Sequence, residues 1–139
     1  MNRRKSLIVA LLCVANGVMA QSVEDGLKDL YYGKYQSAKQ NLEKVIAAKP
    51  TDDKAYYYLG IAQLGLEDQA GAEATFQKGL QAVPASALLQ AGMGRIDLLK
   101  GNAAAAKQKF EAASTATEGR DGDVARAIAD ANTEVPKVG

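Results

Sequence analysis

The chain has 139 residues, enough for one domain, and its 17 basic and 16 acidic side chains give a net charge of +1. This balance argues against a protein that binds polyanions. One cysteine and no histidine exclude an internal disulfide, a Cys/His zinc site, histidine-bound haem and Ser–His or Cys–His nucleophiles. We therefore predict a protein that binds rather than catalyses, and that holds no metal or cofactor.

Residues 1–20 have the organisation of a secretory signal peptide. Arg-Arg-Lys at 3–5 precedes a short apolar run at 7–15, and Val-Met-Ala at 18–20 precedes a cleavage point before Gln21. A membrane anchor is disfavoured because the apolar run is far shorter than the roughly 20 residues that span a bilayer. Cleavage leaves 119 residues with 14 basic and 16 acidic side chains. We expect an exported protein, periplasmic or extracellular, that does not span the membrane after cleavage.

A repeat of 34 residues runs through the rest of the chain. Five positions recur in three copies, and a proline recurs in two: Gly26, Gly60 and Gly94; Leu30, Leu64 and Leu98; Ala38, Ala72 and Ala106; Leu42, Phe76 and Phe110; Ala48, Ala82 and Ala116; Pro50 and Pro84. A period of this length is typical of repeat proteins, in which each unit buries its apolar face against the next. We place the repeats at about 21–52, 53–86 and 87–120, within a domain of residues 21–136.

Each repeat divides into two amphipathic helices. In the second copy, Tyr56, Leu59 and Leu64 lie at helical spacing, and Ala72 and Phe76 resume the pattern after a break at 66–69. Prolines end the second helix of the first two copies, while 51–53 and Ser86 offer caps for the helices that follow. Small residues at the recurring glycine and alanine positions let paired helices approach closely, and the bulky residue four after each alanine fills the adjoining gap.

These residues resemble the tetratricopeptide repeat (TPR) family. The second copy carries its pattern at Tyr56, Leu59-Gly60, Ala72, Phe76 and Pro84. The third copy fits except that Glu118 replaces the proline, and the first lacks the large residue and leucine of the first helix. The resemblance implies an all-α fold, a right-handed superhelical stack of antiparallel helix pairs.

Residues 121–136 begin a fourth period and then stop. Val124, Ala127, Ile128, Ala131 and Val135 form one apolar stripe, which predicts a final helix that covers the open face of the stack. The alternative is the first helix of a fourth repeat in a longer protein. Residues 137–139 are a short tail.

The resemblance also implies a binding groove, lined mainly by the first helix of each repeat, that receives a peptide or a helix. Carrying the pattern over position by position, we predict these groove residues: Leu27, Leu30, Tyr31, Tyr57, Tyr58, Ile61, Leu64, Ala91, Arg95 and Leu98, with Leu99 as a further candidate. The family's lysine and asparagine clamp for a C-terminal carboxylate is missing, because its positions carry Val23, Leu27, Tyr58, Leu88 and Gly92.

All six tyrosines lie between residues 31 and 58. Since successive helical residues diverge by about 100°, Tyr56, Tyr57 and Tyr58 cannot all enter one core. Two interpretations are open: the rings pack the first two repeats together, or Tyr31, Tyr57 and Tyr58 face a ligand.

Other chemistry is weakly indicated. Acidic pairs at 52–53 and 67–68 lie at helix starts or turns, where carboxylates cap free N–H groups. The basic residues between 100 and 109 are interrupted by acids and have no interleaved aromatic rings, so nucleic-acid binding is not expected. The sequence predicts a non-enzymatic adaptor that holds a peptide or helix of another envelope protein. The alternative is a structural subunit of an envelope assembly or homo-oligomer.

Overall fold

The computed structural model describes residues 21–134, and the predicted signal peptide (1–20), Val135, Pro136 and the predicted tail (137–139) lie outside that range. Within residues 21–134 the chain forms seven α-helices and no strand. The helices are α2 (Val23–Tyr31), α3 (Tyr35–Ala48), α4 (Asp53–Gly65), α5 (Gln69–Ala82), α6 (Ala87–Leu99), α7 (Ala103–Ala116) and α8 (Gly122–Glu134).

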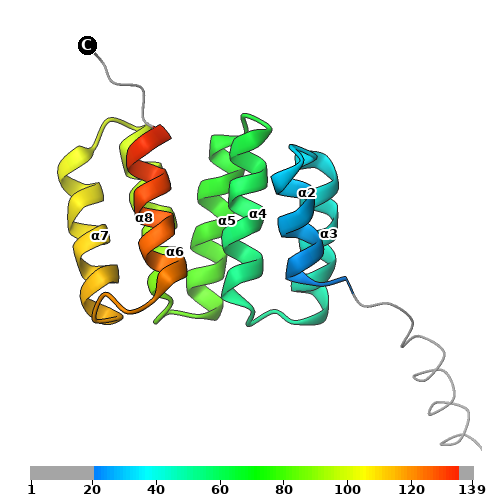
Figure 1. Cartoon of the computed structure of the whole chain (residues 1–139), viewed down its shortest axis with the longest axis horizontal. Coiled ribbons are helices and arrows are strands. Elements are labelled where there is room, and N and C mark those ends of the chain that lie inside the picture. The colour runs from blue at the N-terminus through cyan, green and yellow to red at the C-terminus, as the bar shows by residue number, and fades with distance from the viewer. Residues whose placement is uncertain (1–20, 135–139) are drawn as a thin grey trace, which may run out of the picture.

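The helices form three pairs that stand side by side. The pairs α2–α3, α4–α5 and α6–α7 follow one another along the long axis of the molecule, and α8 lies beside the last pair (Figure 1). They fall within residues 21–52, 53–86 and 87–120. The predicted all-α solenoid of stacked helix pairs is therefore confirmed.

Polar side chains set the starts of several helices. Ser22 and Asp25 form a reciprocal capping box at α2. Asp52 and Ser86 accept hydrogen bonds from backbone N–H groups of the first turns of α4 and α6, as the sequence predicted, and Asp68 does the same for α5.

The recurring glycines lie where the two helices of each pair cross. A methyl group added at Gly26 would lie 2.6 Å from Leu42 Cδ2, and one at Gly94 would lie 2.5 Å from Phe110 Cε1. Gly60 faces the ring of Phe76 in the same way. Each glycine therefore makes room for a bulky side chain sixteen residues later, which is the packing reason that the repeat implies.

Most of the other recurring residues pack as the pattern requires, but Ala48, Ala82 and Ala116 are exposed at the ends of α3, α5 and α7. Ala38, Ala72, Ala106, Leu42 and Phe76 are fully buried. Tyr56 is also buried, and its hydroxyl donates to the carbonyl of Pro50, 2.8 Å away, which ties α4 to the turn before it. Leu59 and Phe110 are buried as well, whereas Pro50 and Pro84 are exposed in the connections after α3 and α5.

One polar contact recurs at the same period although its residues differ. The side chain of Asn41 donates to Asp29 (2.6 Å), Thr75 donates to Gln63 (2.6 Å), and Lys109 donates to Asp97 (2.5 Å). Each pair joins the first helix of a repeat to the second across twelve residues. The Gln63–Thr75 pair is buried, so each of its polar groups needs the other.

Candidate functional site

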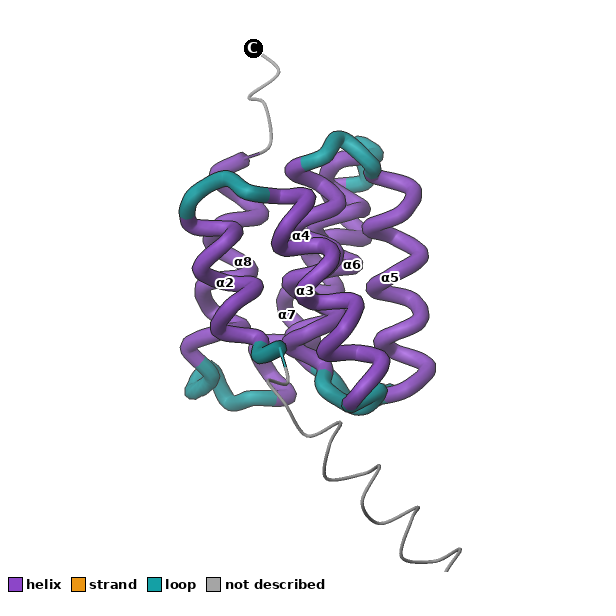
Figure 2. The backbone as a smooth tube through the Cα atoms, turned by 90° about the vertical axis from the view of Figure 1, so that its right-hand side faces the viewer, coloured by secondary structure: helices purple, strands orange, loops and turns teal. Residues whose placement is uncertain are grey.

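The candidate site is the face on which α2 and α8 both stand forward of α4. Figure 1 shows α2 and α8 in front, with α4 between them and α7 beyond α8 at the end of the stack. Figure 2, seen along the stack, places α2 and α8 at one side and α5 at the other. This face, which we call the groove, has α4 and α6 as its floor, with α2 at one side and α8 packed over α6.

A cavity of about 390 Å³ opens between α2 and α4 at their N-terminal ends. Its lining mixes apolar side chains with charges of both signs. Leu27 and Tyr58, two of the predicted groove residues, lie in it, and Lys54 and Asp123 reach it from α4 and α8.

The predicted groove residues do not all share one environment. Tyr31 is 84% exposed, and six others are half-buried: Leu27, Leu30, Tyr58, Ile61, Leu64 and Leu98. Tyr57, Ala91 and Arg95 are buried, so the expectation that they line an open surface is corrected. Leu99 is 38% exposed at the end of α6.

The last helix is the reason for this burial. α8 packs mainly on α6, and its Val124, Ala127 and Ala131 join the buried cluster that contains Ala91 and Tyr57. Within the described residues, the predicted apolar stripe therefore packs on this cluster, with Val124, Ala127 and Ala131 buried and Ile128 half-buried. It covers the third-repeat part of the groove and makes only a small contact with α7, rather than covering the open end of the stack as expected.

Arg95 illustrates the effect. The side chain is only 8% exposed, and its guanidinium forms an ion pair with Glu134 at the end of α8. A buried cation needs such a partner because desolvation without one is costly. In this structure the one basic residue among the predicted groove positions is therefore paired within the chain.

The tyrosines divide between the two interpretations. Tyr56 and Tyr57 belong to the core, and the ring of Tyr57 stacks on Phe76 with centroids 5.9 Å apart. Tyr31 and Tyr32 are exposed and meet edge to face, while Tyr58 is half-buried against Tyr57. Core packing thus explains Tyr57, and Tyr58 is the ring available to the groove.

Burial also shifts the acidity of these rings. Desolvation raises the pKa of Tyr57 to about 12, although the nearby Arg95 opposes the shift. The pKa of Tyr58 is raised too, first by desolvation and then by the carboxylate of Asp123, against the opposing effect of Lys54. Both hydroxyls stay protonated at neutral pH and can act as hydrogen-bond donors.

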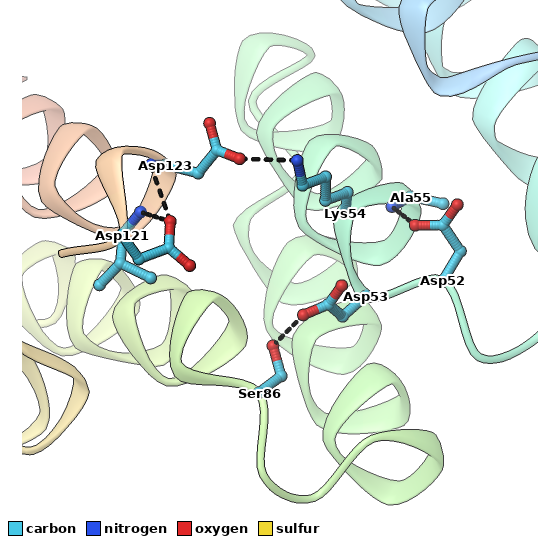
Figure 3. Close-up of polar contacts among 8 residues, drawn as sticks. Asp52, Asp53, Lys54, Ala55, Ser86, Asp121 and Asp123 are labelled. Atoms are coloured by element: carbon cyan, nitrogen blue, oxygen red, sulfur yellow. Dashed lines mark hydrogen bonds and ion pairs between the residues drawn. The ribbon is translucent and has the colours of Figure 1, made fainter. Parts of the chain in front are cut away.

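Figure 3 shows the polar contacts where α4, α6 and α8 begin. Lys54 Nζ lies 2.7 Å from Asp123 Oδ2, which joins α4 to α8 across the groove. The hydroxyl of Ser86, the N-cap of α6, donates to Asp53 at the start of α4 at a distance of 2.7 Å. The hydrogen bond and the charge of Asp123 raise the pKa of Lys54, so the lysine remains a cation.

The described residues contain neither a cluster of metal-ligand side chains nor a helix that could span a membrane. Across residues 21–134 no three Asp, Glu, Cys or His side chains gather as metal ligands would. None of the helices from α2 to α8 is both long and apolar enough to cross a membrane.

The fold and this groove define an α-solenoid of helix–turn–helix repeats. Residues 30–96 match the family model described as tetratricopeptide repeat. The predicted resemblance is confirmed.

Two similar proteins extend the comparison. An "Hsp70-Hsp90 organizing protein" of Triticum aestivum is 37% identical over 82 residues, which cover 59% of this chain. The match spans only 14% of that relative's length. Among solved structures, the second TPR domain of human RPAP3, in complex with the HSP70 peptide SGPTIEEVD, superposes with a TM-score of 0.61 at 21% identity. It covers 81% of this chain and 94% of that one, which supports the fold.

Proposed function

We propose that this protein is an exported, non-enzymatic interaction module that holds a peptide or helix of another envelope protein in its groove. The observation that carries the proposal is the open cavity between α2 and α4, lined in part by Leu27 and Tyr58. Half-buried apolar side chains beside such a cavity gain further burial when a ligand covers them, and tyrosine adds a hydroxyl for hydrogen bonding.

The ligand is expected to differ from that of the carboxylate-clamp domains. The RPAP3 domain is described in complex with an HSP70 peptide. At the clamp positions this chain instead has Val23, Leu27 and Tyr58, all half-buried, and the buried Leu88 and Gly92. These residues supply neither the cation nor the amide that holds a terminal carboxylate. We propose that apolar side chains of the ligand, rather than a free C-terminus, are recognised.

Site-specific crosslinking in the native cell tests the proposal. A photoreactive amino acid at Ile61, half-buried on α4, is expected to capture a specific envelope protein. The same group at Gln77, an exposed residue of α5, is the matched control and is expected to capture none. The captured protein is then purified and titrated against the wild-type chain and against Tyr58→Ala.

The titration shows whether the captured protein binds in the groove. Tyr58→Ala should keep the helical circular-dichroism signal and weaken binding by about tenfold, since a hot-spot tyrosine contributes on the order of 1–2 kcal/mol. Equal capture from Ile61 and Gln77, or unchanged affinity for Tyr58→Ala, would contradict a groove-binding function.

Export is a separate part of the proposal and has its own test. It rests on the basic start, apolar run and small residues within 1–20. The protein isolated from the cell envelope should begin at Gln21 when its N-terminus is sequenced. A chain found in the cytosol with residues 1–20 intact would contradict it.

Self-assembly is the second candidate function, and one observation favours it. Tyr31 and Tyr32, 84% and 63% exposed, form an edge-to-face pair at the turn after α2. Exposed aromatic rings are enriched at protein interfaces. A molecular mass that rises with concentration in light scattering, and that Tyr31→Ser with Tyr32→Ser returns to the monomer, would support self-assembly.

A further inference from the structure

The position of α8 differs from that of the other first helices. α4 packs more on α3 than on α2, and α6 packs more on α5 than on α4. α8 reverses this preference, because it packs mainly on α6 and only lightly on α7. The helix has therefore moved from the end of the stack toward the groove.

The connection before α8 explains the shift. Residues 49–52 and 83–86 connect the earlier repeats, and each connection has a proline in second place. The connection 117–121 is one residue longer, and Glu118 stands where the proline would be. Glu118 and Gly119 both have positive φ, 53° and 68°, so the chain turns differently after α7.

Two ion pairs join α8 to the floor of the groove. Asp123 meets Lys54 of α4, and Glu134 meets Arg95 of α6. The two acids are eleven residues apart, about three helical turns or roughly 16 Å along one face of α8. The helix is thus held by a carboxylate near each end.

The apolar contact between these ends is small. α8 buries Val124, Ala127 and Ala131 and packs the half-buried Ile128 beside them, whereas the second helices of the repeats insert Leu42, Phe76 and Phe110 at their crossings. Because the free energy of burial scales with apolar area, alanine contributes much less than leucine or phenylalanine. α8 is therefore attached by less apolar surface than the helices of the repeats.

We propose that α8 is an internal occupant of the groove that a partner helix replaces. The partner would carry the chemistry of α8: a stripe of small apolar residues flanked by two carboxylates about three turns apart, which pair with Lys54 and Arg95. The proposal rests on the proposed function, because both use the same groove. It adds that the third-repeat part, including Ala91 and Arg95, becomes available only when α8 leaves.

The test uses the full chain with Asp123→Lys and Glu134→Lys together, so that both ends of α8 meet like charges. The control, Glu43→Lys with Glu111→Lys, changes net charge equally at exposed acids of α3 and α7, which pair only with Lys39 and Lys107. Backbone amide exchange is measured by mass spectrometry. In the double variant, α8 amides should exchange at least about tenfold faster, with α4 to α7 unchanged and the control like wild type.

A synthetic peptide of residues 122–134 then serves as the probe. It should bind the opened variant saturably, and it should bind wild type at least about tenfold more weakly. If α8 stays protected in the variant, or is unprotected already in wild type, the proposal is wrong. Release of α8 without peptide binding would also overturn it.

A second variant is used if Asp123→Lys with Glu134→Lys unfolds the whole chain. Asp123→Asn with Glu134→Gln removes both ion pairs without repulsion and should show the same changes, smaller in size. Because the peptide is this chain's own helix, the result does not depend on an external partner. Failure here with a partner still captured at Ile61 would overturn α8 exchange and leave the proposed function standing.

Discussion

Gly60→Ala tests the packing rule on which the repeat depends. The added methyl group would overlap the ring of Phe76, which is fully buried. The ring has little room to move, because Gly92 also lies close to its Cδ1 and Cε1 atoms and Tyr57 stacks on its face. The substitution therefore compresses a filled site rather than an adaptable one.

Two opposing contributions set the size of the effect. Overpacking a well-filled core costs about 1–3 kcal/mol, while replacing glycine by alanine within a helix gains about 1 kcal/mol. Because the ring of Phe76 is fully buried and lies against both Gly92 and Tyr57, we expect the upper part of the packing range. The net loss should be about 1–2 kcal/mol, and for a domain of this size it should lower Tm by roughly 4–8 °C.

Thermal unfolding followed by circular dichroism, with urea titration for the free energy, measures this loss. Gly122→Ala is the matched control, since Gly122 is also helical and a methyl group there meets nothing within 4 Å. It should be neutral or slightly stabilising. The double variant Gly60→Ala, Phe76→Ala should lose less than the two single losses combined, because the methyl group fills part of the space that the ring leaves. A Gly60→Ala variant within about 0.5 kcal/mol of wild type would refute the reasoning.

Two other predictions follow from buried polar groups. Thr75→Val should cost about 1–3 kcal/mol in urea unfolding, because it leaves the side chain of Gln63 buried without its partner; adding Gln63→Leu should recover most of the loss, and no recovery would contradict this account. Raising the pH should also destabilise the fold. The pKa of Tyr57 is about 12 in the folded chain against 10.0 when exposed, so the folded state holds its proton longer than the unfolded state. The stability present below pH 10 should fall between pH 10 and 12 by about 2–3 kcal/mol, and Tyr57→Phe should remove most of that dependence.

The repeat was predictable because its packing uses the same residue types in each copy. Gly26, Gly60 and Gly94 recur as identities, and the bulky partners recur sixteen residues later. A period in identity therefore reveals both helices of a pair and the contact between them. The caps at Asp52 and Ser86 were equally local, since an N-cap depends on its own side chain and the next turn.

The recurring polar contact was missed because its residues share a role but no identity. Asp29, Gln63 and Asp97 accept from Asn41, Thr75 and Lys109 in successive repeats. A search for equal residues at the 34-residue offset does not register such pairs. Aligning the copies by hydrogen-bonding capacity would have found them.

The burial of Tyr57, Ala91 and Arg95 could not be predicted from the pattern of their own helices. Their positions on the first helices were read correctly, but their exposure depends on where α8 lies, and an apolar stripe does not say which of two neighbours it will cover. The sequence signal was in the connection. With Pro50 and Pro84 the earlier repeats step by 34 residues, whereas the start of α8 follows that of α6 by one residue more and lacks the proline.

That one-residue change joins the fold to the proposed binding behaviour. A helix held at the regular step would rest mainly on α7 and leave Arg95 open on the floor of the groove. With the longer connection, α8 lies on α6, and Glu134 can reach Arg95 while Asp123 reaches Lys54. Two of the contacts that hold α8 in the groove are ion pairs, formed by Asp123 and Glu134. A partner helix with similarly placed carboxylates can therefore compete for Lys54 and Arg95. The connection at 117–121 therefore decides how much of the groove a ligand meets first.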